Sequence, residues 1–301
     1  MNISLSKIIL FIPCYNCDKQ ILRVIDQLQS NDNYKYFNEI LLIDNRSQDS
    51  TVKKSVDKLI DTNIDNIKVL KNSENVGLGG THKVAFNYAK QNNASHVAVL
   101  HGDDQGSITD LINILNKKDH EHYDCCLGSR FNRHSKAIGY SKFRIFGNWV
   151  FNSIFSFSAG KIITDLGAGL NIYKVSAISD ERITKFANDL TFNCYMLLFS
   201  ISQKQSIKFF PITWREDDQI SNVRLFSQAI KTFRIALGYF IRGSKSLDCI
   251  QNTTDFSSLR LEEYYPGKMI NLVIPMAGRG SRFSNSGYEI PKPLVDLNGR
   301  P

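Results

Sequence analysis

The residues of this chain best suited to chemistry are acids that follow short apolar runs. Asp44 closes EILLID (39–44), and Asp103 and Asp104 follow HVAVLHG (96–102). Carboxylates just beyond a buried strand can hold Mg²⁺ or Mn²⁺, because a hard cation commonly takes one or two carboxylates together with the phosphates of its substrate. The spacing therefore predicts either a metal site that includes Asp103 or, more simply, a polar turn.

Glycines and cations stand near these acids in the sequence. Gly77, Gly79 and Gly80 in NVGLGG would allow close approach of the backbone to a ligand and left-handed dihedral angles, although a plain turn before a helix would use them equally well. Arg130 and Arg144 offer guanidinium groups, which can bond phosphate oxygens in pairs. A surface role is the alternative for either arginine.

The net charge of +8 and the pI near 9.1 favour partners that carry phosphates, namely nucleotides, lipid head groups or nucleic acid. A generally basic surface would give the same balance. The first apolar run breaks at Pro13, which indicates a strand rather than a signal peptide. No stretch approaches the roughly 20 apolar residues that span a bilayer. We expect a cytoplasmic protein, at most peripheral on a membrane.

Short apolar runs alternate with amphipathic segments over the first 130 residues. This alternation predicts an α/β fold of Rossmann type, with a mostly parallel sheet and helices on both faces. The expected strands are 7–13, 39–44, 66–70 and 96–102, and the expected helices are 49–60, 81–91, one through Ile21, Ile25 and Leu28, and one capped by Ser107. Ligands bind beyond the carboxyl ends of such strands. Four loops should therefore share one rim: 13–16, 44–49, 75–80 and 101–105.

The cysteines and two of the histidines are expected to have no role in metal binding or catalysis. Cys14 and Cys17 form a C-x-x-C, but no second pair follows at zinc spacing, so reduced cysteines that bind no metal are favoured. His120 and His122 lie in a polar connector, where we expect both to be solvated.

Two later segments, 142–160 and 222–245, are aromatic and basic with helical spacing. Each is either a core helix or a C-terminal amphipathic helix at a membrane interface. A first domain (1–245) is then expected to give way to a polar linker at 246–268. A new strand followed by a glycine-rich loop begins a further domain at 269–301.

Five motifs carry a family resemblance. IPCYN, LLIDNRSQDST, NVGLGG, HGDDQ and GSRF occur in the order and spacing of the inverting family 2 glycosyltransferases, which have the GT-A fold. FGNWVFNSIF and TDLGAGLNIYKVSAI extend the likeness to enzymes of the dolichyl-phosphate mannose synthase type. The resemblance covers about residues 7–220.

This resemblance implies a nucleotide site along the predicted rim. It gives Asp44 the role of orienting the base, since a carboxylate accepts hydrogen bonds from base N–H groups. The other residues that the resemblance places around the donor nucleotide are Pro13, Tyr15, Asn16, Asn45, Gly77, Gly79 and Arg215.

In the resembling enzymes the acid motif reads Asp-x-Asp, often with a glutamine two residues further on. By that likeness Asp103 and Gln105 are the metal-binding pair, for Mg²⁺ or Mn²⁺, and Asp103 also faces the donor diphosphate. His101 replaces the first acid. Asp104 stands at an ordinarily apolar position and could compensate, although in an extended backbone it should point away from Asp103.

For catalysis the resemblance implies phosphate contacts by Arg130 and Arg144, and it places Asp165 near the acceptor. Inversion on a hydroxyl acceptor needs a general base, and Asp165 is the candidate for that role. A phosphate acceptor is already ionised and needs none.

The expected function is transfer of a sugar from a nucleoside-diphosphate sugar to a polyprenyl-phosphate or glycan acceptor, in the biosynthesis of surface polysaccharide. Nucleic acid is not an expected partner. MAGRGSRF and PKPLVDLNGRP resemble the start of sugar-phosphate nucleotidyltransferases, and the chain holds only about thirty residues of that domain. The rival hypothesis is a nucleotide-binding, catalytically weak adaptor for such a C-terminal domain.

Overall fold

The computed structural model describes residues 6–218, 225–248, 250, 254 and 261–264. The nucleotidyltransferase-like segment at 269–301 and the start of the helix expected at 222–245 lie outside the described residues.

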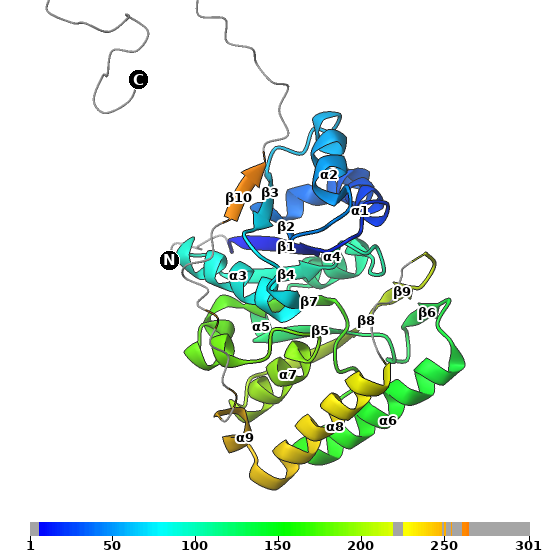
Figure 1. Cartoon of the computed structure of the whole chain (residues 1–301), viewed down its shortest axis with the longest axis vertical. Coiled ribbons are helices and arrows are strands. Elements are labelled where there is room, and N and C mark those ends of the chain that lie inside the picture. The colour runs from blue at the N-terminus through cyan, green and yellow to red at the C-terminus, as the bar shows by residue number, and fades with distance from the viewer. Residues whose placement is uncertain (1–5, 219–224, 249, 251–253, 255–260, 265–301) are drawn as a thin grey trace, which may run out of the picture. The chain divides into compact units, whose positions relative to one another are not determined.

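A mostly parallel sheet forms the centre of the fold (Figure 1). Its strands, in spatial order, are β10 (Leu261–Tyr264), β3 (Ile67–Asn72), β2 (Glu39–Asp44), β1 (Ile8–Cys14), β4 (His96–Leu100), β7 (Leu170–Lys174), β5 (Cys125–Ser129) and β8 (Ile207–Pro211). The strands β3, β2, β1 and β4 are parallel, while β7 is antiparallel to both of its neighbours and β10 is antiparallel to β3. The predicted α/β sheet is confirmed.

Helices cover both faces of this sheet because its strands are apolar on both sides. Leu10 and Ile12 of β1 pack toward α1 (Gln20–Gln29), α2 (Thr51–Ile60) and α4 (Ile108–Asn116). Ile9 and Phe11 pack toward α3 (Gly77–Gln91) and α7 (Phe192–Ser202). The short helices of the described chain are α5 (Asp119–His122), α9 (Lys245–Asp248), η1 (Ser30–Tyr36), η2 (Val175–Ile178) and η3 (Glu181–Lys185).

The two aromatic segments form α6 (Lys142–Ala159) and α8 (Leu225–Arg242), which lie side by side (Figure 1). Their contact includes the rings of Phe157 and Phe240, stacked with centroids 5.3 Å apart. Both helices pack one side on the core, through Phe155 and Ala236, and leave other apolar side chains exposed. None of the described helices is long and apolar enough to cross a bilayer.

Three expectations need correction. The helix predicted for 81–91 begins at Gly77, so the glycine segment forms its first turn instead of a preceding loop. His120 is buried, because it packs edge-on against His96 and its carbonyl accepts a hydrogen bond from that ring at 2.9 Å, whereas His122 is exposed as expected. The segment expected as a linker contains α9 and the edge strand β10, within a compact unit that extends to Pro266.

Candidate active site

The carboxyl ends of β1, β2 and β4 meet, as the four-loop rim predicts. The Gly102 amide donates to the Pro13 carbonyl at 3.0 Å, and the Asn45 amide donates to the Cys14 carbonyl at 2.8 Å. A Cβ atom at Gly102 would lie 2.5 Å from the Cys14 sulfur, so this approach requires glycine. The described cysteines, including Cys14 and Cys17, are buried free thiols, as expected.

Asp44 is fully buried at the end of β2, yet half of its carboxylate is unused. Its Oδ2 accepts the Ser47 amide at 2.9 Å, while Oδ1 has no hydrogen-bond partner among the described residues. A buried carboxylate oxygen without a donor is costly. A ligand N–H group would satisfy it, which is the role that the sequence predicts for Asp44.

Tyr15 and Asn16 lie at the mouth of this site. The Tyr15 side chain is 43% exposed and therefore free to cover a planar ligand. Asn16 adopts a left-handed conformation, with φ of 49°, and its side chain accepts the Gln48 amide at 2.9 Å. Pro13 itself is buried and contributes through its backbone.

Asn45 is used within the protein. Its Oδ1 accepts Asn72 Nδ2 at 3.1 Å and the Val76 amide at 2.9 Å, and its Nδ2 donates to Asn75 at 2.9 Å. These bonds join the end of β2 to the turn before α3. The predicted nucleotide contact of Asn45 is therefore indirect in this geometry, through the loop that it holds.

The glycines of NVGLGG also pack against the protein. Gly77 has φ of +73°, as predicted for a left-handed position. The Gly79 amide donates to the Asn188 carbonyl at 2.7 Å, and a Cβ atom there would lie 2.6 Å from the Ala187 carbonyl oxygen. The close backbone approach that the sequence assigns to a ligand is thus occupied by the loop before α7.

Asp103 lies on the acidic loop after β4 and is partly exposed. Its Oδ1 accepts the Gln105 amide at 3.2 Å. Burial, with a smaller contribution from the Asp104 charge, raises the pKa of Asp103 to about 6. The group is thus ionised at neutral pH, but less firmly than an ordinary aspartate.

Asp104 belongs to a different network. It adopts φ of 59°, and its carboxylate accepts Arg23 Nε at 2.6 Å and Gln27 Nε2 at 2.7 Å, both from α1. The backbone here is not extended, contrary to the premise of the prediction. The expected separation of roles nevertheless holds, because α1 occupies both oxygens of Asp104.

Among the described residues, no group of three or more histidine, cysteine, aspartate or glutamate side chains is arranged to hold a metal. With Asp104 bound to α1, Asp103 is the one acid of this loop to which the resemblance assigns a metal. A single carboxylate still suits Mg²⁺ or Mn²⁺ when diphosphate oxygens and water complete the coordination shell. The predicted partner Gln105 uses its backbone amide for Asp103 and its carbonyl for the Arg215 amide, at 2.9 Å.

His101 fills space at the place of the missing acid. Its ring packs directly over Gly169, where any Cβ atom would overlap it. Burial, and then the charge of Arg130, lower the pKa of His101 to about 4, so the ring is neutral at pH 7. Its Nε2 is buried without a hydrogen-bond partner among the described residues. His101 therefore brings no charge to a metal.

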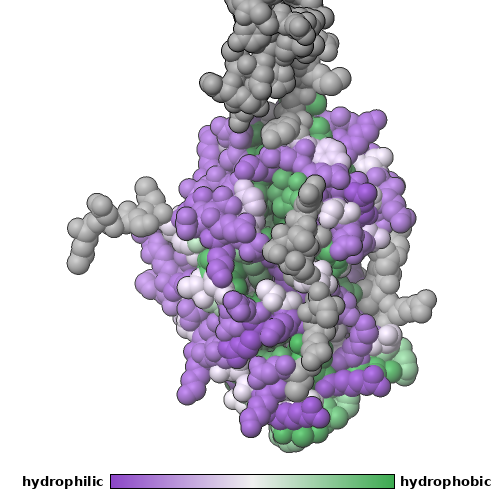
Figure 2. All heavy atoms as spheres, turned by 60° about the vertical axis from the view of Figure 1, so that its left-hand side comes forward, coloured by the Kyte–Doolittle hydropathy of each residue, from purple (hydrophilic) through white to green (hydrophobic). Residues whose placement is uncertain are grey.

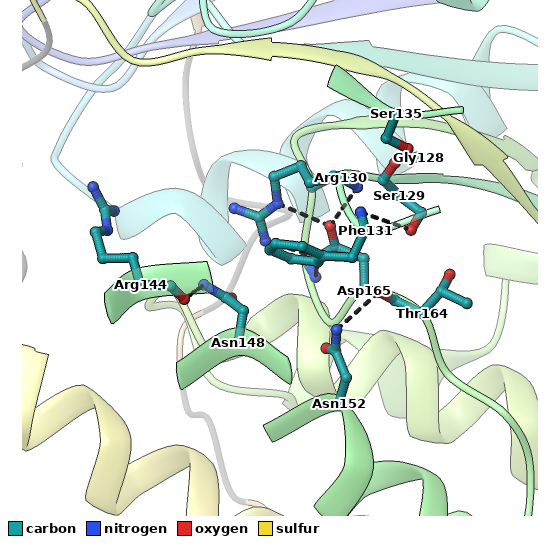
Figure 3. A network of polar contacts seen from close by, with 12 residues as sticks. Gly128, Ser129, Arg130, Phe131, Ser135, Arg144, Asn148, Asn152, Thr164 and Asp165 are labelled. Atoms are coloured by element: carbon teal, nitrogen blue, oxygen red, sulfur yellow. Dashed lines mark hydrogen bonds and ion pairs between the residues drawn. The ribbon is translucent and has the colours of Figure 1, made fainter. Parts of the chain in front are cut away.

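Arg130 and Asp165 form a buried, two-pronged ion pair (Figure 3). Arg130 donates from Nε at 2.8 Å and from Nη2 at 2.7 Å, and the backbone amides of Arg130 and Gly167 donate at 2.8 Å and 3.1 Å. Both carboxylate oxygens are thereby engaged. The geometry gives Asp165 the part of a counter-ion for Arg130, and it leaves no oxygen open for the predicted proton abstraction.

Tyr140 stands between the two predicted catalytic arginines. Its hydroxyl accepts Arg130 Nη1 at 3.0 Å, and its ring centroid lies 4.9 Å from the guanidinium carbon of Arg144. Arg144 forms an ion pair with Glu216. Arg215, next to Glu216 at the end of β9 (Thr213–Arg215), is exposed, and β9 pairs with β6 (Lys136–Ile138).

Sequence reasoning missed Tyr140, Glu216 and Gly169. Glu216 follows Arg215 directly in TWRED, so an acid beside a predicted phosphate ligand was the available signal. Tyr140 and Gly169 carry no local signal, because their roles depend on contacts across the fold.

The structure is thus a mostly parallel sheet covered by helices on both faces, with Asp44 at the end of β2, Asp103 just after β4 and Arg130 just after β5. This is the arrangement that the GT-A resemblance predicts. Residues 9–182, more than half of the chain, match the glycosyl transferase family 2 profile. The chain belongs to that family, and the protein is a glycosyltransferase.

A curated relative is the UDP-N-acetylglucosamine–dolichyl-phosphate N-acetylglucosaminyltransferase of Methanococcus voltae. It is 25% identical over 181 residues, which are 57% of this chain and 70% of the relative.

Among solved structures, glucosyl-3-phosphoglycerate synthase from Mycobacterium tuberculosis with UDP aligns at a TM-score of 0.56 and 11% identity, over 87% of this chain and 90% of that one. Another crystal of that synthase holds Mn²⁺ together with UDP. S. aureus TarS 1–349 with UDP-GlcNAc aligns at 0.50 and 19% identity, over 80% and 73%. These structures establish the GT-A fold alone.

Proposed function

We propose that the protein transfers a sugar from a nucleoside-diphosphate donor to a polyprenyl-phosphate acceptor, with inversion, as a step in the assembly of surface polysaccharide. The observation that carries this proposal is the full engagement of Asp165 by Arg130 beside a second arginine, Arg144. A hydroxyl acceptor would need a free base, whereas a phosphate acceptor needs cations and arrives already ionised. The dolichyl-phosphate acceptor in the name of the archaeal relative supports the same choice.

On the donor side, Asp44 would accept a base N–H group with its unpaired Oδ1, and Tyr15 would cover the base. Asp103 would hold Mg²⁺ or Mn²⁺ against the diphosphate, with Gln105 fixing the orientation of its carboxylate. A bound divalent ion would neutralise the diphosphate as it leaves. Arg215, whose backbone amide donates to the Gln105 carbonyl, would contact a phosphate of the donor.

The proposed acceptor is a lipid, and α6 and α8 offer a surface for it. Their outer sides expose Phe143, Phe146, Trp149, Phe157, Phe226, Phe233, Phe240 and Ile241, which we call the α6–α8 apolar face. Hydrophobic atoms gather at the lower end of the molecule in Figure 2, the end at which Figure 1 places these helices. The same two helices also carry the exposed cations Lys142, Lys231, Arg234 and Arg242. We place it at the surface of the cytoplasmic membrane.

A second candidate function is a nucleotide-binding domain with weak turnover that serves as an adaptor for a nucleotidyltransferase domain beginning near residue 269. The observation in its favour is the neutral ring of His101 at the position of an acid. Asp103 is then the one acid of that loop to which the resemblance assigns a metal, and donor binding should be weaker than at a two-acid site.

Thermal-shift measurements with UDP-, GDP-, CDP- and dTDP-sugars, with and without Mn²⁺, would identify the donor class. Transfer of a radiolabelled sugar from that donor to undecaprenyl phosphate would then test the proposed reaction. We expect turnover in the wild type and at least a hundredfold loss in Asp103→Ala, on the scale of a lost electrostatic contact to the leaving group. Donor binding without any transfer would favour the adaptor. Equal transfer by the wild type and Asp103→Ala would instead overturn the metal-binding role proposed for Asp103.

A further inference from the structure

Two arginine–carboxylate pairs flank Tyr140, and they differ in how firmly each is held. In the first, Asp165 is 0% exposed and Arg130 11% exposed, and backbone amides complete the coordination of the carboxylate. The rings of Phe131 and Trp214 lie within 5.4 Å and 5.5 Å of the Arg130 guanidinium carbon. Removing either partner would leave a buried charge unpaired, so this pair is permanent.

The second pair is more open. The Arg144 side chain is 33% exposed and the Glu216 side chain 18% exposed, and Glu216 bonds Arg144 through Oε1. Exposed or partly exposed pairs of this kind contribute little net free energy, so a competing anion can replace the carboxylate. Arg144 lies in the first turn of α6, and its backbone amide donates to the side chain of Ser141, which caps this helix.

The backbone of Glu216 cannot easily move away. Its amide donates to the Ile138 carbonyl at 3.0 Å, which continues the β6–β9 ladder. Its carbonyl oxygen lies against Gly139, at φ of +75°, where any Cβ atom would overlap it. A change at this residue is therefore confined to the side chain, which can rotate off Arg144 without a loop movement.

We propose that Glu216 is a displaceable internal counter-ion that occupies Arg144 until the phosphate of the acceptor takes its place. The inference rests on the proposed function and refines it, because it makes Glu216 a residue that determines acceptor class. A phosphate monoester, with close to two negative charges, can compete with a single carboxylate for a guanidinium. A neutral hydroxyl cannot, so the pair excludes uncharged acceptors.

Tyr140 contacts both arginines that the acceptor phosphate would meet when it replaces Glu216. Its hydroxyl orients Arg130 and its ring supports Arg144, so the two guanidinium groups are held near one another. The incoming phosphate would meet both cations, while Glu216 swings toward solvent. Asp165 remains in place throughout, because its oxygens are saturated.

The test measures phosphate binding in the absence of donor, so its outcome does not depend on turnover. Affinity for inorganic phosphate and for farnesyl phosphate would be measured by calorimetry on the full chain, for the wild type and for Glu216→Gln. The glutamine keeps the size of the side chain and removes its charge. We expect about threefold to tenfold tighter binding of both ligands by the variant, the range in which a partly exposed ion pair contributes.

Asp218→Asn is the matched control. It removes the same charge two residues further on, where the carboxylate pairs with Arg23 at 2.8 Å. We expect less than a twofold change in phosphate affinity from this control, and no gain from Glu216→Gln once Arg144 is replaced by glutamine. If Glu216→Gln binds only farnesyl phosphate more tightly, Glu216 exchanges specifically with the phosphate of a lipid. If it binds both ligands more tightly to the same extent, Glu216 exchanges with any phosphate.

Weaker or unchanged phosphate binding by Glu216→Gln would overturn the proposal, since Glu216 would then serve to orient Arg144. An equal gain in Asp218→Asn would also overturn it, because the effect would be one of overall charge. Absence of sugar transfer with the expected phosphate result would refute the proposed function and leave the counter-ion exchange standing.

Discussion

Asp103 must carry charge at a place that disfavours charge. Burial raises its pKa to about 6 from an ordinary value near 3.8, which means that the folded chain holds the proton more tightly than the unfolded chain. Between these two pKa values stability falls as the pH rises, and above about pH 6 the penalty is constant. A donor-bound cation would relieve the penalty, so function and stability oppose each other at this residue.

Asp103→Asn should therefore stabilise the metal-free protein while it removes Mn²⁺-dependent binding of the donor. We expect a gain on the order of 1–2 kcal/mol at pH 7.5 and a much smaller gain at pH 4.5, where Asp103 is protonated in the folded state. Thermal unfolding at the two pH values measures the gain, and calorimetry with UDP and Mn²⁺ measures the loss. An equal gain at both pH values would mean that the charge of Asp103 is not the cause.

Asp165→Asn should destabilise the fold strongly, because it leaves the buried Arg130 charge without its counter-ion. We expect a loss of about 3–5 kcal/mol in urea unfolding, and a substantially smaller loss for the double variant Arg130→Met, Asp165→Leu, which removes both charges. Replacement of a general base would lower turnover without lowering the free energy of unfolding. If Asp165→Asn unfolds like the wild type and loses only turnover, the base role predicted from the sequence would be the better account.

At the residue scale, the sequence predicts the positions of those site residues that directly follow a strand along the chain. The positions of Asp44 and Asp103 are predictable because Asp44 ends one apolar strand and Asp103 closely follows another, and parallel strands end on one side of a sheet. The packing of His101 on Gly169 is not predictable in this way, because 68 residues separate the two along the chain. The same holds for the Arg144–Glu216 pair, which spans 72 residues.

At the scale of elements, α3 shows why a glycine motif can be assigned to the wrong partner. A glycine run before an apolar helix predicts a loop near a ligand, and local propensity favours a later helix start. The tertiary hydrogen bond from the Gly79 amide to the Asn188 carbonyl overrides that preference. Lys83 reinforces the contact, since its Nζ donates to Asn188 Oδ1 at 2.7 Å. The ammonium group is buried there, and this burial lowers the pKa of Lys83 to about 7.

Gly79→Ala should separate α3 from the loop before α7. A Cβ atom there would meet both the Ala187 carbonyl oxygen and Phe192, so we expect a loss of about 1–3 kcal/mol. Gly147→Ala is the matched control, because that helical glycine has nothing within 4 Å of an added Cβ atom. There the better helix propensity of alanine should stabilise by up to about 1 kcal/mol. Denaturant unfolding of the two variants would compare them directly, and equal effects would contradict the packing argument.

At the scale of the whole molecule, the apolar side chains of α6 and α8 are divided between the core and solvent. The core-facing set is what helical periodicity predicts for any amphipathic helix. The exposed set is more informative, since contiguous apolar surface is unusual on a protein that meets only water. The sequence left the choice between a core helix and a membrane-interface helix open, because the same stretch of residues supplies both core-facing and exposed apolar side chains.

Trp149→Ser combined with Phe240→Ser should weaken binding to anionic vesicles by about tenfold, because each change removes apolar area from the proposed interface. Co-sedimentation with vesicles of phosphatidylglycerol and phosphatidylcholine measures the bound fraction. Tyr36→Ser combined with Ile60→Ser is the control, as both side chains are exposed but lie in η1 and α2. Equal retention by the two double variants would argue against this face as the membrane contact.

The strand β10 has a practical consequence for where this protein can be cut. It pairs antiparallel with β3, with Leu261 opposite Asn72 and Tyr264 opposite Val69, and so occupies what would otherwise be an open margin of the sheet. Unpaired margins of apolar sheets recruit strands from other molecules. A recombinant chain ended at residue 245, where the sequence alone would draw the boundary, would bare β3 and be prone to self-association. Ending the chain beyond Tyr264 keeps that margin closed.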